Sequence, residues 1–103
     1  MRVPSLFLAL AAACGGPAAA QTAEALYAQG LAATCTQCHG TQGRATIGST
    51  VPALAGMPRD YLALQLRAFK AGTRPATVMH QLAKGYDDAQ IDQLASYFAA
   101  QKK

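Results

Sequence analysis

Five consecutive residues in the first half of the chain have the side chains needed to attach and ligate a metal-containing cofactor. They read Cys35-Thr36-Gln37-Cys38-His39. Two thiols at positions i and i+3 lie on one face of a helical turn, where both can react with one flat ring. The histidine that follows can offer an imidazole nitrogen to an iron atom beneath that ring. The C-x-x-C-H pattern therefore predicts one covalent haem c, attached through Cys35 and Cys38, with His39 as an axial iron ligand.

Three other uses of these residues compete with haem attachment. A structural zinc site needs four ligands, and the only Cys and His residues beyond residue 20 are Cys35, Cys38, His39 and His80. The adjacent Cys38 and His39 fit poorly into one tetrahedron. A thioredoxin-like redox pair requires a strand followed by a helix, and the sequence shows no strand pattern. A structural disulfide would close a very short loop and constrain the unfolded chain little. Haem attachment is the interpretation that we favour.

The sixth iron ligand has three candidates: Met57, Met79 and His80. A methionine opposite a histidine is used in electron-carrying haem proteins because it raises the reduction potential. Met79 lies forty residues beyond His39, in a segment expected to be irregular, so the chain can pass around the ring and return on its far side. We expect Met79 to bind the iron and Met57 to line the pocket. With both axial positions filled by protein, the expected function is one-electron transfer.

A small all-α fold is expected to position these residues. Apolar periodicity and capping residues predict helices at 21–34, at 59–71 and after Asp87, with a helical turn at 78–84. Glycine, proline and small polar residues fill 40–56, which is expected to be a loop. The chain has 103 residues with four Tyr, three Phe and no Trp, which makes a thin core. We therefore predict three to four short helices wrapped around one covalent haem, which would complete the interior.

The first twenty residues are typical of an export signal. Arg2 precedes an apolar run, and Ala18-Ala19-Ala20 forms a small-residue cleavage pattern. We predict a signal peptide at 1–20, a single monohaem domain at 21–103, and a periplasmic location. The alternative is lipid attachment at Cys14, as in a lipoprotein. The part after residue 20 has no apolar run long enough to span a membrane.

The net charge of +4 comes from nine Lys and Arg residues against five Asp and Glu. The basic residues are dispersed along the sequence, which does not indicate a nucleic-acid surface. A mild preference for acidic partners is expected. By their positions, Arg44 and Arg59 are candidates for contacts with haem propionates.

Beyond the attachment motif, the chain resembles class I cytochrome c over nearly all of residues 21–103. Gly40, Gly43 and the segment Pro52-Ala53-Leu54-Ala55-Gly56 are similar to the front half of cytochrome c4-type and flavocytochrome c-type domains. The resemblance implies that the carbonyl of Pro52 accepts a hydrogen bond from the ligand His39. Such a bond fixes the orientation of the ligand ring and tunes the metal.

The C-terminal half is similar to the haem subunit of flavocytochrome c sulfide dehydrogenase. The matching segments are Thr77-Val78-Met79, Leu82-Ala83-Lys84-Gly85-Tyr86 and Leu94-Ala95-Ser96-Tyr97-Phe98. This resemblance implies a partner: a flavoprotein with FAD that oxidises sulfide and passes electrons singly to the haem. The best-known haem subunits of this kind carry two such domains, whereas this chain has one attachment motif. The alternative is a freely diffusing monohaem carrier that serves oxidases or reductases.

Overall fold

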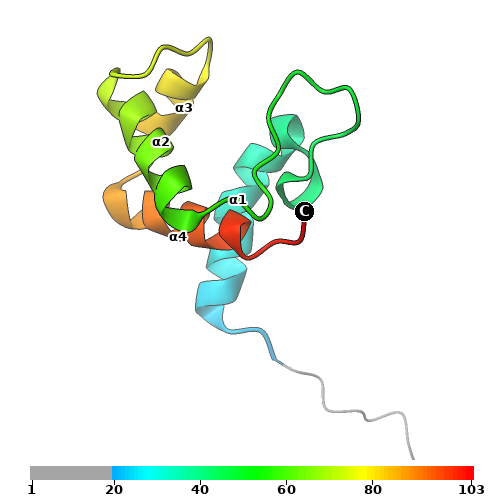
Figure 1. Ribbon diagram of the computed structural model, residues 1–103. Helices are drawn as coiled ribbons and strands as arrows, with labels where there is room; N and C mark the ends of the chain where they lie inside the picture. Colours follow the sequence, from blue (N-terminus) through cyan, green and yellow to red (C-terminus); the bar gives the residue numbers. More distant parts are fainter. Residues whose placement is uncertain (1–19) are drawn as a thin grey trace, which may run out of the picture.

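The computed structural model describes residues 20–103. The predicted signal peptide, apart from Ala20, and Cys14 lie outside these residues. Four α-helices and one short 3-10 turn follow one another along the chain (Figure 1): α1 (Ala23–His39), η1 (Thr41–Gly43), α2 (Arg59–Ala71), α3 (Met79–Lys84) and α4 (Asp88–Ala99). Residues 20–103 contain no strand, which confirms the all-α prediction. No helix in this part is long and apolar enough to cross a membrane.

Local capping signals set three of the helix ends. Thr22 caps α1 by accepting a hydrogen bond from the Ala25 amide at 3.1 Å. Asp87 and Gln90 form the reciprocal capping box at the start of α4. Gly72 ends α2 in the left-handed conformation, at φ +77°, which costs glycine little because it has no Cβ. All three ends agree with the sequence prediction.

Two predicted features are wrong. The first helix continues to His39 instead of ending at Thr34. Threonine is a weak helix former, but the hydroxyls of Thr34 and Thr36 donate to carbonyl oxygens three residues earlier, at 2.8 and 3.1 Å. Met79, expected in an irregular segment, instead begins α3, and α3 confirms the helical turn predicted at 78–84.

The core lies where α4 packs against α1 and α2, and α2 in turn packs against α3. In Figure 1, α4 crosses α1, while α2 and α3 form one side of the molecule and the loop after α1 forms the other. Ile91 and Leu94 of α4 are the largest completely buried side chains in residues 20–103. The remaining buried members of the core cluster are Ala32, Leu62, Ala63, Ala95 and Phe98. Four of these seven side chains belong to α4, so α4 supplies most of the core.

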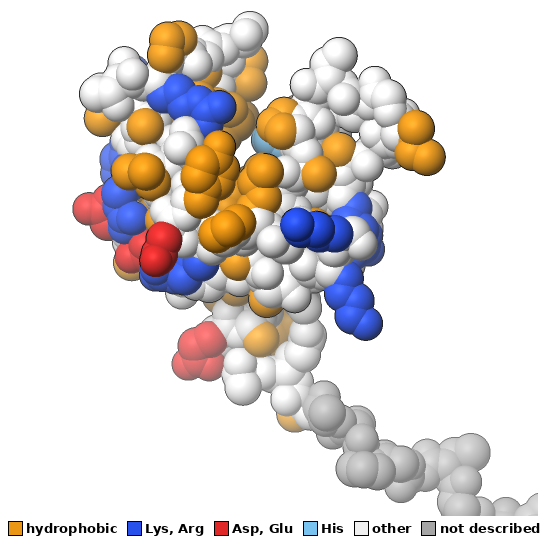
Figure 2. Space-filling view, viewed as in Figure 1, with side chains coloured by type: hydrophobic (Ala, Val, Ile, Leu, Met, Phe, Trp, Pro, Cys, Tyr) orange, Lys and Arg blue, Asp and Glu red, His pale blue; other side chains and the backbone are white. Residues whose placement is uncertain are grey.

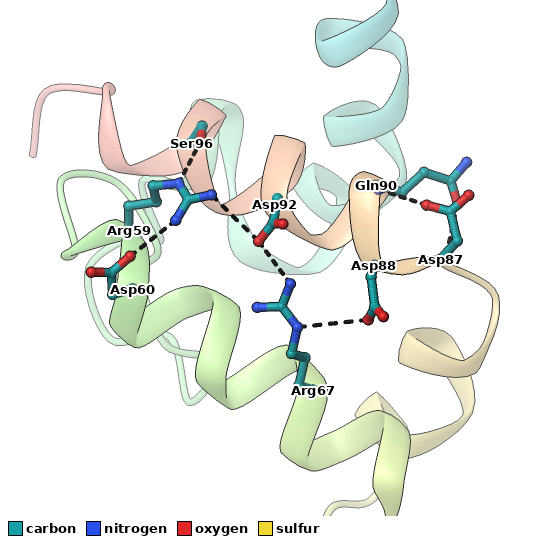
Figure 3. A network of polar contacts seen from close by, with 8 residues as sticks. All are labelled: Arg59, Asp60, Arg67, Asp87, Asp88, Gln90, Asp92 and Ser96. Atoms are coloured by element: carbon teal, nitrogen blue, oxygen red, sulfur yellow. Dashed lines mark hydrogen bonds and ion pairs between the residues drawn. The ribbon is translucent and has the colours of Figure 1, made fainter.

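A polar network joins α2 to α4 across the surface (Figure 3). The Asp92 carboxylate on α4 lies 2.8 Å from Arg67 Nη2 and 3.4 Å from Arg59 Nη2, both on α2. Arg59 also donates to Ser96 Oγ at 3.0 Å and lies 3.0 Å from Asp60. Arg59, a candidate for contact with a haem propionate, is therefore engaged on the α2–α4 face.

Replacing Asp92 with Asn should lower the free energy of unfolding by about 1 kcal/mol. The Asp92 carboxylate pairs with two arginines that are roughly half exposed, and each exposed ion pair contributes ~0.2–1 kcal/mol. Urea unfolding measures the change. Asp60→Asn is the matched control, because Asp60 is 94% exposed and pairs with Arg59 alone; its effect should stay within ~0.5 kcal/mol. An equal loss in both variants would contradict the bridging role of Asp92.

Candidate functional site

The attachment segment forms the last turn of α1. Because α1 continues through His39, Cys35 and Cys38 stand one helical turn apart on the same face. Neither cysteine forms a disulfide within residues 20–103. Cys35 is half-buried against the core, whereas Cys38 is exposed. The two thiols are therefore available to one ligand on one side of the helix.

His39 is buried and held in a single orientation. Its side chain is part of the packed interior at 8% exposure, and its Nδ1 lies 2.7 Å from the carbonyl oxygen of Pro52. A carbonyl oxygen only accepts hydrogen bonds, so Nδ1 carries the proton. The other ring nitrogen, Nε2, then keeps its lone pair for a metal. This is the common arrangement of a metal-binding histidine, with one nitrogen anchored to a carbonyl and the other free.

Glycines bring the Pro52 segment back to the end of α1. The carbonyl of Gly43 accepts hydrogen bonds from the amides of Leu54 and Ala55, at 2.8 and 3.1 Å. Gly40 has φ +86°, and a Cβ built there would lie 2.0 Å from the carbonyl oxygen of Arg44. The sharp turn directly after His39 therefore requires glycine. This turn makes the contact between His39 and Pro52 possible.

Gly43→Ala should destabilise the protein and reduce haem incorporation. A Cβ at Gly43 would lie 2.7 Å from the Phe98 ring and 3.0 Å from the Ala55 amide, at φ +81°, so the turn at Gly43 would have to move away from both α4 and the Pro52 segment. Strained backbone alone costs on the order of 1–3 kcal/mol.

Gly48→Ala is the matched control for Gly43→Ala, because Gly48 has the same φ of +81° with nothing within 4 Å of its built Cβ. Thermal unfolding and haem absorbance per chain measure both variants. Equal losses in the two would show that backbone strain alone is responsible and that the close packing at Gly43 has no role.

Large apolar side chains are left uncovered on α2 and around α3. Four large ones on α2 and around α3 are 46–63% exposed: Tyr61, Leu64, Val78 and Leu82. Figure 2 shows a hollow between the part formed by α2 and α3 and the loop that follows α1, with hydrophobic side chains gathered along its edges. A folded domain gains stability by covering such surface. A flat apolar group held by the thiols of α1 suits this hollow.

The three candidates for the sixth ligand differ in their surroundings. Met57 is partly buried and packs against the core cluster, so its thioether is used as filler. Met79 and His80 are both half-buried at the start of α3. The Nδ1 atom of His80 is buried and has no hydrogen-bond partner among residues 20–103. Met79 is thus placed by a helix, with His80 beside it as the other potential donor.

Metal binding without a haem finds little support here. The part of the chain that the structure describes contains no group of three or more Cys, His, Asp or Glu side chains placed to hold a metal ion. Burial raises the pKa of the Cys35 thiol, while hydrogen bonds to Thr34 and Tyr86 lower it. The donor set fits a haem, since two thiols lie on one helical face beside one oriented imidazole.

Sequence reasoning missed one feature of this site. The hydroxyl of Tyr86, which lies between α3 and α4, is 2.5 Å from the hydroxyl of Thr34, next to Cys35. These two residues are 52 positions apart in the sequence. No local pattern links them, so only the folded structure brings Tyr86 to the attachment segment.

Comparison with known proteins identifies the class. The family pattern described as cytochrome c matches residues 20–102. The chain therefore belongs to the cytochrome c family, whose cofactor is a covalently bound haem c and whose function is electron transfer.

Individual relatives agree with this class. The chain is 44% identical over 71 residues to a thiosulfate dehydrogenase electron acceptor of Thiomonas intermedia, covering 69% of this chain and 33% of the relative. It is 38% identical over 102 residues to cytochrome c-552 of Acidithiobacillus ferridurans, covering 94% and 44%. It is 40% identical over 68 residues to the cytochrome subunit of sulfide dehydrogenase of Chlorobaculum tepidum, covering 66% and 60%. The matched region thus spans from one third to about three fifths of these relatives.

A solved structure shows the same fold. Cytochrome c4 of Acidithiobacillus ferrooxidans superposes with a TM-score of 0.63 at 34% identity, covering 75% of this chain and 46% of that one. The resemblance to cytochrome c4-type domains and to a sulfide dehydrogenase cytochrome subunit is confirmed.

Proposed function

We propose that Cys35 and Cys38 form the two thioether bonds to the haem and that His39 and Met79 are its axial ligands. The observation that carries this proposal is the anchored imidazole: Nδ1 of His39 is bonded to Pro52, which leaves Nε2 free on the same helical turn as the two thiols. Helix α3 supports Met79 as the second ligand because it packs on α2, beside the apolar hollow.

The residues of this chain have simple tasks in electron transfer. The bound haem supplies a one-electron change between ferric and ferrous iron, with no bond made or broken at the metal. Pro52 holds the His39 ring, and the exposed apolar side chains on α2 and around α3 would pack against a bound haem and exclude water from it. With His39 and Met79 as its two axial ligands, the haem would keep no coordination site for oxygen or peroxide. The chain therefore accepts one electron from a donor and gives one electron to a downstream oxidant.

The donor that we propose is a flavoprotein that oxidises sulfide. In this scheme the partner would take two electrons from sulfide, leaving zero-valent sulfur, and this chain would accept them one at a time, giving each to a downstream oxidant before it takes the next. Two findings support this partner. The C-terminal half resembles the haem subunit of flavocytochrome c sulfide dehydrogenase, and the chain is related to the cytochrome subunit of sulfide dehydrogenase of Chlorobaculum tepidum. An export signal at residues 1–20 and a periplasmic location belong to the same proposal.

A second candidate is a free electron carrier. The related protein of Thiomonas intermedia is described as a thiosulfate dehydrogenase electron acceptor. In that role this chain would diffuse between a dehydrogenase that oxidises an inorganic sulfur compound and a terminal acceptor, and it would form no permanent complex with either. The two candidates share the haem and differ only in the donor and in the lifetime of the contact.

Native purification of the tagged holoprotein from the periplasm separates these candidates. A permanent subunit should elute with a flavin-containing chain in a fixed ratio, and sulfide should reduce the haem within the purified complex. The free carrier predicts a flavin-free monomer whose haem is reduced by a thiosulfate-oxidising fraction and not by sulfide. That result would contradict the flavoprotein partner.

A further inference from the structure

Residues 75–85, which include α3 and are called the Met79 segment below, make few polar contacts with the rest of the protein. In the described part of the chain, the hydrogen bonds of this segment stay inside it or go to the next residue, Tyr86. Ala83 is the one buried residue of α3. A segment with so little buried surface opens readily unless its ends are fixed. The contacts at the two ends of the Met79 segment therefore set how firmly it is held.

The first end of the Met79 segment is fixed to α2. The amide of Arg74 donates to the carbonyl oxygen of Ala68 at 3.3 Å, and the Arg74 guanidinium lies 4.6 Å from the centre of the Phe69 ring. A guanidinium placed over an aromatic ring at this distance is attracted to it. Both partners belong to α2, so this end does not connect the segment to α1, the helix of the attachment motif.

Tyr86 fixes the other end to two helices. Its carbonyl oxygen accepts a hydrogen bond from Lys70 Nζ on α2 at 2.5 Å, and its hydroxyl lies 2.5 Å from Thr34 Oγ1 on α1. The Thr34 proton is directed at the carbonyl oxygen of Leu31, 2.8 Å away, so the Tyr86 hydroxyl is the donor to Thr34. The Tyr86 side chain also packs against the core cluster. Tyr86 is thus the residue that ties the end of the Met79 segment to both α1 and α2.

The two axial ligands proposed for the iron lie on these separate parts of the fold. His39 ends α1 together with the two attachment thiols, so a bound haem would keep its place relative to α1. Met79 begins α3, which packs on α2 on the opposite side of the molecule from the loop that follows α1 (Figure 1). The Met79 thioether can therefore stay on the iron only while α3 keeps its position relative to α1.

We propose that Tyr86 is a positioning residue that holds Met79 at the iron, because it fastens the Met79 segment to α1 and α2, and that it thereby limits the access of external ligands. The inference rests on the proposed function, because it requires Met79 as the second axial ligand. The apparent affinity of the iron for an external ligand is proportional to the fraction of molecules in which the sixth position is open. Loss of either contact of Tyr86 should raise this fraction, and the affinity with it.

Imidazole titrated into the ferric holoprotein of Tyr86→Phe tests this inference. The variant keeps the ring and the carbonyl group bonded to Lys70, and it removes only the hydroxyl. Imidazole should bind about 2- to 10-fold more tightly than in the wild type, which is the effect of losing one ordinary hydrogen bond. Without imidazole, the far-red absorption band of ferric iron bound to methionine should remain.

Tyr27→Phe is the matched control for Tyr86→Phe. It also removes a tyrosine hydroxyl that joins two helices, since the Tyr27 hydroxyl on α1 accepts a hydrogen bond from Gln90 on α4 at 2.9 Å. Tyr27 lies outside the Met79 segment and its two ends, so this variant should bind imidazole as the wild type does.

Lys70→Met removes the other contact of Tyr86, and it decides the case if Tyr86→Phe yields no holoprotein. It should also tighten imidazole binding. Lys84→Met is its matched control, because Lys84 ends α3, is exposed, and has no side-chain hydrogen bond or ion pair within residues 20–103. Wild-type imidazole affinity in Tyr86→Phe or in Lys70→Met, or an equal rise in the matched control, would overturn the inference and leave the proposed function intact. A wild type that lacks the far-red methionine band would instead overturn the proposed ligation by Met79, and this inference with it.

Discussion

Met79→Ala should abolish the far-red absorption band that marks methionine bound to ferric haem iron. It should also lower the reduction potential by a sizeable fraction of the ~0.8 V range over which axial ligands set haem potentials. The physical reason is that the soft thioether favours ferrous iron, so its loss favours the ferric state. Optical spectroscopy of the ferric protein and a redox titration measure the two effects. The covalent haem itself should remain, because Met79 takes no part in attachment.

Two control variants identify the ligand. Met57 packs against the core, and leucine has nearly the same volume as methionine. Met57→Leu should therefore keep both the far-red band and the wild-type reduction potential. His80→Ala removes the neighbouring donor, whose Nδ1 has no hydrogen-bond partner within the described residues, and it should also keep the band. A band that survives in Met79→Ala and disappears in Met57→Leu would reassign the ligand to Met57. If the wild type and all three variants lack the far-red band, methionine is not an iron ligand.

The double variant Cys35→Ala/Cys38→Ala should lose all covalent haem and most of its cooperative unfolding transition. Only Ile91 and Leu94 are large, completely buried side chains in residues 20–103, so the protein interior has little to replace the cofactor. Mass spectrometry of the denatured chain measures the haem, and thermal unfolding followed by circular dichroism measures the fold. Cys38→Ala alone should retain a haem through the remaining thioether.

Cys14→Ala is the control for this pair, because a cysteine inside a cleaved signal peptide has no part in haem attachment. Its product should match the wild type in mass and absorbance. A wild-type product that carries lipid, and loses it in Cys14→Ala, would contradict cleavage after Ala20. A double variant that still carries covalent haem would contradict the assignment of Cys35 and Cys38.

Helix ends were predictable from sequence where one or two neighbouring residues decide them. Three helix boundaries depend on contacts between residues at most four positions apart. Thr22 and the Asp87–Gln90 box start α1 and α4, and Gly72 ends α2, each where the pattern predicts. The C-terminal end of α1 was predicted too early, because intrinsic propensity counts Thr34 and Thr36 against a helix. Their hydroxyls satisfy their hydrogen bonds within the helix instead.

The site was predictable only as far as the motif and the family resemblance extend. The C-x-x-C-H spacing indicates the cofactor, and the resemblance pointed to Pro52, whose carbonyl lies 2.7 Å from His39 Nδ1. Contacts between distant segments carry no comparable signal. The bond between Thr34 and Tyr86 and the bridge from Asp92 to two arginines depend on how helices pack, and that packing is not encoded in any short stretch.

The intact mass of the exported, purified and fully denatured protein tests the central claim most directly. Two thioether bonds survive denaturation, so the account predicts a red product whose mass is that of residues 21–103 plus one haem. A colourless product with the mass of its amino acids alone would contradict haem attachment at Cys35 and Cys38. The electron-transfer function proposed for this chain would then have no cofactor to support it.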